Sequence, residues 1–80
     1  MRLDKFLKVS RLIKRRTVAN EACDNGNVSV NGKVAKASFD LKPGDIIEIT
    51  FGEKSLKVKV TEIAEHVLKN EASSLYEVLS

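Results

Sequence analysis

Basic side chains crowd the beginning of the sequence, at a density that suits phosphate binding. Seven of the chain's 14 Lys and Arg residues lie between Arg2 and Thr17, and Asp4 is the only acid among them. The rest of the chain holds all of its other acids, so a basic segment precedes a mildly acidic one. Like charges this close repel one another, which favours a protein that binds a polyanion. The basic residues are Arg2, Lys5, Lys8, Arg11, Lys14, Arg15 and Arg16.

Residues that could perform covalent or metal chemistry are few, and none stands in a catalytic pattern. Cys23 is the only cysteine and falls on the apolar side of a predicted helix, where we expect a small buried side chain. His66 is the only histidine and has no partner at ligand spacing, so we interpret it as a surface residue. The glycines fit turns rather than a phosphate-binding loop. The sequence therefore predicts a binding protein that is not an enzyme and uses no metal or cofactor.

The basic residues recur at every third position, a spacing that an unbroken α-helix cannot keep on one face. At about 3.6 residues per turn, Lys14 would lie within the apolar stripe formed by Leu3 and Leu7, and its charge would be buried. We therefore predict that the first helix ends near Val9 or Ser10 and that a turn leads into a second helix. This break would place all seven basic side chains on one surface.

Two polar residues are predicted to begin the helices. Asp4 suits the N-cap of the first helix, where its carboxylate would accept backbone N–H groups. A second interpretation gives Asp4 the task of orienting a neighbouring arginine or contacting an RNA base edge. Thr17 is predicted to cap the second helix in the same way. The N-terminus of that helix, beside Arg15 and Arg16, would attract phosphate, and a solvated run of charges is the alternative.

The second helix is predicted to pack closely on the first, because its apolar residues are small. Gly26 is expected to end this helix, with Asn25 as the alternative. The predicted apolar side comprises Val18, Ala19, Ala22 and Cys23.

Further along the chain, apolar residues alternate with polar ones, which predicts strands. Residues 28–30 and 33–35 flank Asn31-Gly32, a strong signal for a tight hairpin. Lys33 extends from this turn and either reaches the same ligand as the basic segment or keeps the turn soluble.

Lys-Pro-Gly-Asp at residues 42–45 is predicted to form a type II turn. This turn leads into a strand at residues 46–51, the first strand of a second predicted hairpin. Residues 56–60 also alternate and should pair antiparallel with that strand. Charges on the polar face of this hairpin can pair across the strands, which explains them without a ligand. That face carries Glu48, Thr50, Lys57 and Lys59.

Together the elements predict an α+β fold in which two N-terminal helices pack on a small antiparallel sheet. Residues 61–74 are expected to form a loop with a short helical turn at most, and residues 75–79 a last strand. The length of 80 residues and the 42% of hydrophobic residues predict one folded domain over residues 1–80. No apolar run approaches the roughly 18 residues of a membrane helix, and no signal peptide is evident, so we expect a cytoplasmic protein.

The aromatic residues do not form a platform for stacking single-stranded bases. At least two of the four are expected in the core, and the rest are too few to stack successive bases. The sequence therefore favours recognition of structured RNA by its shape and its phosphates. The aromatic residues are Phe6, Phe39, Phe51 and Tyr76.

Four motifs occur in order along the sequence: RLDKFL at residues 2–7, RT at 16–17, NGNVSVNGK at 25–33 and KPGD at 42–45. Their ordered combination resembles the RNA-binding domain named after ribosomal protein S4, over roughly residues 1–51. Residues 52–80 are expected to complete the sheet. The resemblance implies that the two helices and the turn after them form an RNA-binding face. It places at or near that face Arg2, Asp4, Lys5, Lys8, Arg11, Lys14, Arg15, Arg16, Thr17 and Lys33.

Within this family, the chain resembles the stand-alone members that act in ribosome-associated quality control. The resemblance implies binding to large-subunit rRNA and peptidyl-tRNA on split large ribosomal subunits, with an alanine-tailing factor as a partner. Arg2, Asp4 and Arg16 would then contact the RNA. The related heat-shock group, whose members usually carry a longer basic C-terminal extension, implies recycling of large subunits as an alternative. An accessory subunit of an RNA-modifying enzyme, or a module that binds an acidic protein or an anionic membrane, are further alternatives.

Overall fold

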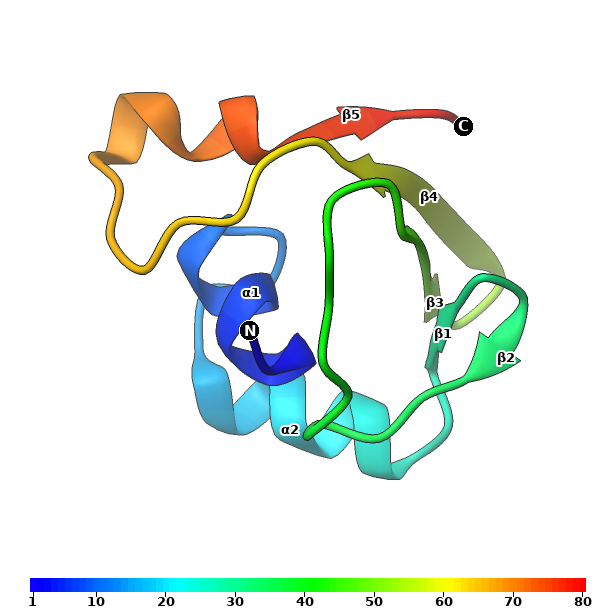
Figure 1. Ribbon diagram of the computed structural model, residues 1–80. Helices are drawn as coiled ribbons and strands as arrows, with labels where there is room; N and C mark the ends of the chain where they lie inside the picture. The colour runs from blue at the N-terminus through cyan, green and yellow to red at the C-terminus, as the bar shows by residue number, and fades with distance from the viewer.

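A computed structural model describes residues 1–80 and shows two α-helices, a 3₁₀ helix and an antiparallel sheet (Figure 1). The strands lie in the order β2-β1-β3-β4-β5, and every neighbouring pair is antiparallel. This architecture confirms the predicted α+β fold. The elements are α1 (Leu3–Val9), α2 (Arg16–Asp24), β1 (Val28–Val30), β2 (Lys33–Val34), β3 (Ile46–Phe51), β4 (Lys54–Val60), η1 (Lys69–Leu75) and β5 (Tyr76–Val78).

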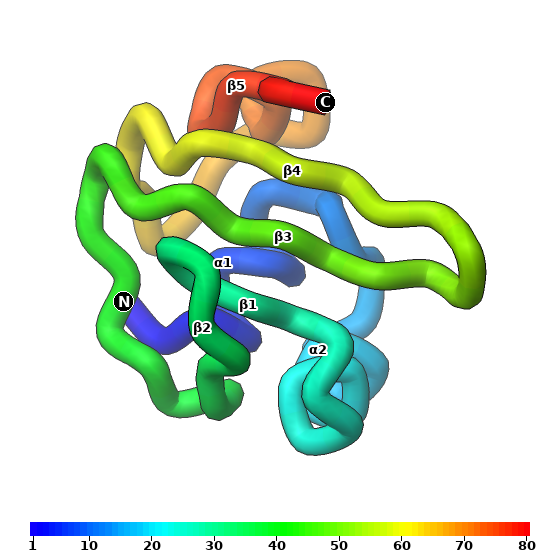
Figure 2. Tube along the Cα trace, turned by 90° about the vertical axis from the view of Figure 1, so that its right-hand side faces the viewer, coloured from blue at the N-terminus to red at the C-terminus, as the bar shows by residue number.

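The two helices cover one face of the sheet, and the apolar core lies between these layers (Figures 1 and 2). Phe6 and Leu7 of α1 are fully buried in one cluster with Ile47 of β3 and Val58 of β4. Burial of each such side chain contributes about 1.5–3 kcal/mol, so this cluster fixes α1 against the sheet. Cys23 of α2 is also buried, as predicted, and burial together with Asp4 and Asp24 raises the pKa of its thiol to about 11.

The outer face of the sheet is polar, and its charges lie opposite one another. Glu48 of β3 faces Lys57 of β4, and Lys59 faces Glu77 of β5. This register confirms the predicted pairing of the two long strands, although no ion pair joins these side chains directly. Opposite charges at such positions stabilise a sheet modestly, so these lysines have a structural role.

The first helix ends where the spacing of the charges predicted, at Val9 with Ser10 as its C-cap. Arg11 adopts a positive φ of 63°, a conformation that a helix cannot contain. The Ser10 hydroxyl donates to the carbonyl of Leu7 at 3.3 Å, and the N–H of Ile13 donates to the same carbonyl at 3.0 Å. Ile13 is thereby buried in the core, and the chain turns sharply into α2.

The second helix ends in the manner predicted for Gly26, which has a φ of 78°. The N–H of Gly26 donates to the carbonyl of Cys23, and the N–H of Asn27 donates to that of Ala22, the two bonds of a Schellman motif. The next turn, Asn31-Gly32, has φ values of 54° and 84°, which match the predicted tight hairpin.

The C-terminal part of the chain forms a short 3₁₀ helix, η1, before it returns to the sheet as β5. The predicted helical turn therefore begins at Lys69, and the last strand spans three residues rather than five. Residues 61–68 have no regular secondary structure and cross from β4 toward α1 (Figure 1). None of the helices combines the length and apolar character required to cross a membrane.

Candidate RNA-binding surface

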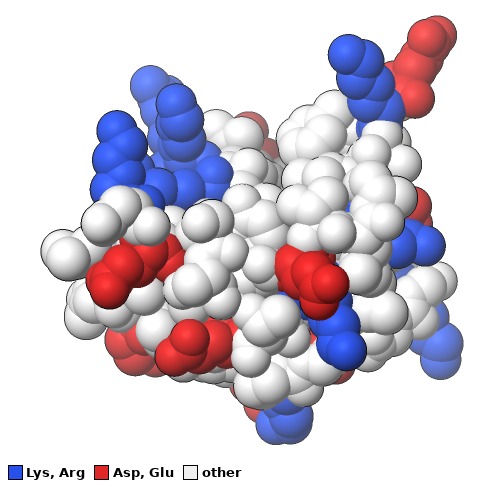
Figure 3. All heavy atoms as spheres, turned by 90° about the horizontal axis from the view of Figure 1, so that it is seen from above, with Lys and Arg blue, Asp and Glu red and all other residues white.

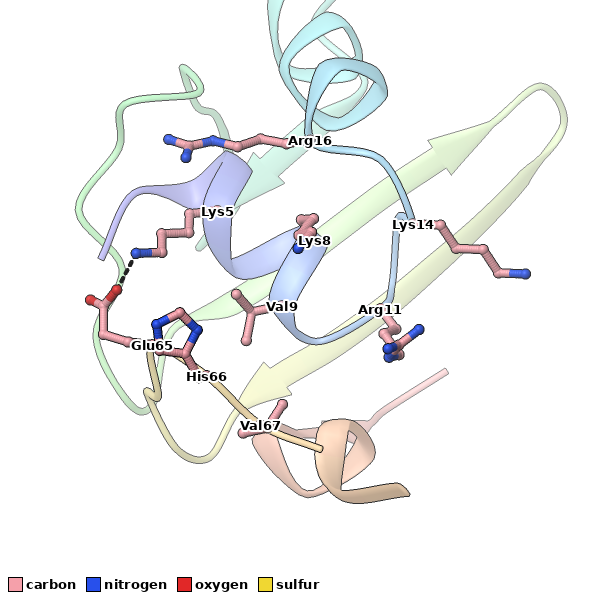
Figure 4. A pocket seen from close by; sticks show the side chains of 9 residues that line it. All are labelled: Lys5, Lys8, Val9, Arg11, Lys14, Arg16, Glu65, His66 and Val67. Carbon is pink, nitrogen blue, oxygen red and sulfur yellow. Dashed lines mark hydrogen bonds and ion pairs between the residues drawn. The ribbon is translucent and has the colours of Figure 1, made fainter. Parts of the chain in front are cut away.

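A hollow of about 270 Å³ lies beside α1 and the turn after it, and basic side chains dominate its lining (Figure 4). Five of its nine lining residues are Lys or Arg, and only one is acidic. We call this hollow the basic pocket. It is lined by Lys5, Lys8, Val9, Arg11, Lys14, Arg16, Glu65, His66 and Val67.

The cations of the basic pocket lie on two sides of α1. In Figure 4, Lys5 and Arg16 extend in the same direction, whereas Arg11 and Lys14 extend from the turn on the other side. Lys8 lies between the two groups, in the last turn of the helix. All except the half-buried Lys5 are exposed, so their charges are available to a polyanion. Figure 3, which shows one face of the whole molecule, has a group of Lys and Arg side chains at one corner, and further Lys and Arg side chains stand among acids along the opposite side and the lower edge.

The other residues predicted for the site lie outside the basic pocket. Arg2 lines a groove beside α2 with Lys36, and Thr17 lines a separate, open hollow with Asp4 and Arg16. Arg15 is the exposed N-cap residue of α2, and Lys33 is exposed on the edge strand β2 and lines none of these hollows. The structure therefore gathers five of the seven N-terminal cations around the basic pocket and connects Arg2 to them through Asp4.

Asp4 is the buried centre that connects the arginines of the two helices. Its carboxylate accepts hydrogen bonds from Arg2 Nε at 3.2 Å, Arg16 Nε at 3.4 Å and Asn20 Nδ2 at 3.3 Å, as well as from the N–H of Lys5 at 2.8 Å. The Asp4 side chain is 3% exposed, whereas the two arginines are about half exposed. The second interpretation of Asp4, orientation of neighbouring arginines, is therefore confirmed.

The predicted helix caps were wrong. Arg2, not Asp4, is the N-cap residue of α1, because the loop before β3 supplies the acceptors: Leu3 N–H donates to the carbonyl of Phe39 at 2.8 Å, and Asp4 N–H to that of Ala37 at 3.1 Å. Thr17 lies inside α2, which begins at Arg16. Neither N-cap residue makes a side-chain capping bond.

The pKa of Asp4 lies below its usual value of 3.8, although burial alone would raise it. Hydrogen bonds from Arg2, Asn20 and Arg16, with the charge of Arg16, together outweigh that burial. Because the folded protein lowers this pKa, the ionised carboxylate stabilises the fold above the pKa of the unfolded chain. That contribution is lost as the pH falls through the folded pKa.

Replacement of Asp4 by asparagine is expected to destabilise the fold by about 1–2 kcal/mol at pH 7. The effect is moderate because Arg2 and Arg16 are half exposed, so water can solvate them once the negative charge at position 4 is removed. Urea unfolding should show the difference from wild type shrinking as the pH falls from about 5 toward 2. Asp24→Asn is the matched control, since Asp24 is exposed and forms no ion pair. A loss for Asp4→Asn that stays constant over this pH range would contradict the assigned role.

Sequence reasoning did not identify Asn20, Glu65 or His66 as parts of the site. Asn20 lies four residues after Arg16, on the same face of α2, so helical spacing could have revealed it. Glu65 pairs with Lys5 across 60 residues of sequence, and no local pattern signals such a contact.

More than half of the chain matches a known class of domain. The sequence model of the S4 domain matches residues 1–47, which contain α1, α2 and the strands β1 and β2. The fold and the basic surface are thus those of an S4-domain protein.

Close relatives specify the family within this class. The chain is 60% identical over 78 residues to the RQC P-site tRNA stabilizing factor of Halalkalibacterium halodurans. The aligned residues cover 98% of this chain and 89% of the relative. It is 56% identical over 79 residues to the protein of the same name from Bacillus subtilis, over 99% and 92% of the two chains. The chain belongs to this family of RQC P-site tRNA stabilizing factors.

A solved structure confirms the fold over the whole chain. Heat shock protein 15 of Vibrio cholerae superimposes with a TM-score of 0.91 at 30% sequence identity, over 100% of this chain and 82% of that one. The relation to the heat-shock group that the motifs suggested is therefore confirmed.

Proposed function

We propose that the chain is a non-enzymatic, cytoplasmic RNA-binding protein of ribosome-associated quality control. On large ribosomal subunits split from stalled ribosomes, it holds the peptidyl-tRNA in the P site and contacts large-subunit rRNA. An alanine-tailing factor then extends the nascent chain on the same particle. The name of the relatives that are 60% and 56% identical supports the tRNA-stabilising role.

The observation that carries this proposal is the gathering of five cations around the basic pocket, all of them within the residues that match the S4 domain. Lys and Arg neutralise RNA phosphates and release their counterions, which drives binding without reading the sequence. The broken helix pair presents these charges on a rigid frame, so it suits the fixed spacing of phosphates in folded RNA.

Asp4 adds orientation to this charge. Its carboxylate holds one side of both Arg2 and Arg16 and leaves the rest of each guanidinium exposed. A guanidinium offers donors in a planar fork, so one edge can bond Asp4 while the other faces a phosphate. An arginine held this way loses less side-chain entropy on binding than a free one.

A second candidate is a recycling factor for large subunits that carry nascent chains. The TM-score of 0.91 with heat shock protein 15 favours it, because the two folds are alike over the whole of this chain. Both candidates use the same basic surface. They differ in what happens after this protein has bound the large subunit. A quality-control factor supports extension of the nascent chain, whereas a recycling factor frees the subunit.

Sedimentation through a sucrose gradient tests the binding step. A protein tagged at its C-terminus is suitable, because the Met1 amine bonds Asp40 at 2.8 Å and an N-terminal tag would break this contact. At low salt we expect the chain to sediment with large subunits that carry peptidyl-tRNA, and ribonuclease treatment should release it. Recovery only in the soluble fractions, or binding that survives ribonuclease, would overturn the proposal.

Reconstituted alanine tailing separates the two candidates. When the chain is added to stalled large subunits with the tailing factor and alanyl-tRNA, the quality-control role predicts more and longer tails. The recycling role predicts unchanged tails and a faster return of free subunits.

A further inference from the structure

The irregular segment at residues 61–68 is held against α1 by its apolar side chains. Ile63, Ala64 and Val67 are partly buried against the core, while Glu65 and His66 between them are exposed. The partly buried side chains on both sides of Glu65 and His66 fix the segment without regular secondary structure. They also direct the two polar side chains toward the basic pocket, which both of them line (Figure 4).

An ion pair between Glu65 and Lys5 ties the segment to the helix. The hydrogen bond and the charge of Lys5 lower the pKa of the Glu65 carboxyl below its ordinary value, so Glu65 is ionised at neutral pH. Glu65 is the only acid that lines the basic pocket. The pair therefore places residues 65–67 as a second wall, opposite the wall that α1 and the turn provide.

The imidazole of His66 has no hydrogen-bond partner within the chain. Its two neighbours are held in place, because Glu65 pairs with Lys5 and Val67 packs against the core. Its imidazole lies beside Glu65 and Val9 at the rim of the basic pocket (Figure 4). A neutral imidazole offers one N–H donor and one acceptor nitrogen. Both remain available to a ligand that the neighbouring cations attract.

We propose that His66 is a further RNA-contacting residue, which bonds the ribose-phosphate backbone of an RNA held in the basic pocket. The inference rests on the proposed function, because it requires RNA at this surface. It goes beyond that function, since His66 lies outside residues 1–47, the part that matches the S4 domain. The second wall thus adds a contact that the matched domain alone lacks.

The chemistry of this contact differs from that of the cations around it. Lys and Arg carry donors only and attract any phosphate, in DNA as in RNA, whereas a neutral imidazole also has an acceptor nitrogen, which can accept a hydrogen bond from the ribose 2′-hydroxyl. Bonding to a phosphate oxygen and bonding to the 2′-hydroxyl are two forms of one backbone contact. They predict different results when the hydroxyl is removed.

Binding measurements at pH 8 on the full chain test the inference, with bulk tRNA as the first probe. We expect His66→Ala to weaken binding about threefold to tenfold, as for the loss of one hydrogen bond, and to leave the salt dependence unchanged. His66→Gln should bind within about twofold of wild type, because its amide retains a donor and an acceptor. Asn70→Ala is the matched control, an exposed neutral residue of η1 that lines no pocket, and should bind like wild type.

A second probe identifies the atom that is bonded. An RNA stem-loop and the same sequence made as DNA are compared for wild type and His66→Ala. Loss of affinity for the RNA alone supports a bond to the 2′-hydroxyl, and equal loss for both supports a bond to phosphate. Wild-type affinity of His66→Ala for tRNA and both stem-loops would overturn the inference while leaving the proposed function intact. Failure of the wild-type chain to bind any of these probes would instead overturn the proposed function.

Discussion

The affinity of the chain for tRNA is expected to fall by about a hundredfold or more when the salt concentration rises from about 50 to about 200 mM. Each phosphate neutralised by Lys or Arg contributes a slope of about −0.7 to −0.9 to the logarithm of affinity against the logarithm of salt concentration. The basic pocket supplies five such cations, so about five phosphates are neutralised. Fluorescence anisotropy with labelled tRNA at several salt concentrations measures this slope directly.

Single substitutions show which cations produce the slope. Lys8→Ala should reduce its magnitude by about one, because exposed Lys8 lies in the middle of the pocket. Lys59→Ala should leave it unchanged, because Lys59 lies on the outer face of the sheet, opposite Glu77. An affinity that does not depend on salt would contradict phosphate neutralisation by this surface.

Replacement of Arg16 by alanine is expected to weaken binding to tRNA between about tenfold and a hundredfold at constant salt. This loss exceeds that expected for an ordinary surface lysine, because Arg16 is both oriented by Asp4 and placed at the start of α2. Hydrogen bonds to charged groups contribute about 1.5–3 kcal/mol, which corresponds to this range. The same titration, repeated with Arg16→Ala and Lys59→Ala, gives the comparison.

The fold should survive the Arg16 substitution, so a loss of binding reports on the contact itself. Without Arg16, the Asp4 carboxylate still accepts hydrogen bonds from Arg2, Asn20 and the N–H of Lys5. We expect a melting temperature within a few degrees of wild type. Equal affinities of Arg16→Ala and Lys59→Ala would remove Arg16 from the site, whatever their stability.

Local patterns in the sequence predicted most of the fold. The misplacement of Lys14 on an unbroken helix located the end of α1, and Asn31-Gly32 located the first hairpin. Alternation of apolar residues located β3 and β4, including their pairing. Each of these signals depends on residues within a few positions of one another, where sequence and structure are closely coupled.

The parts that sequence reasoning missed depend on contacts between distant residues. Asp4 is not a cap because carbonyls of the loop at residues 37–39 already bind the N-terminus of α1. The wall of the basic pocket at residues 65–67 depends on an ion pair across 60 residues. The seven cations were expected on one surface, yet only five of them line the basic pocket. The side chains of these five extend in different directions, because the turn at Arg11 lies between α1 and α2.

The most direct test of the central claim is a high-resolution map of this chain bound to a large ribosomal subunit that carries P-site peptidyl-tRNA. The account predicts that α1 and the start of α2 face the RNA, with Lys5, Lys8 and Arg16 against backbone phosphates and the outer face of the sheet turned away. A map in which the outer face of the sheet contacts the RNA while the basic pocket faces solvent would contradict it.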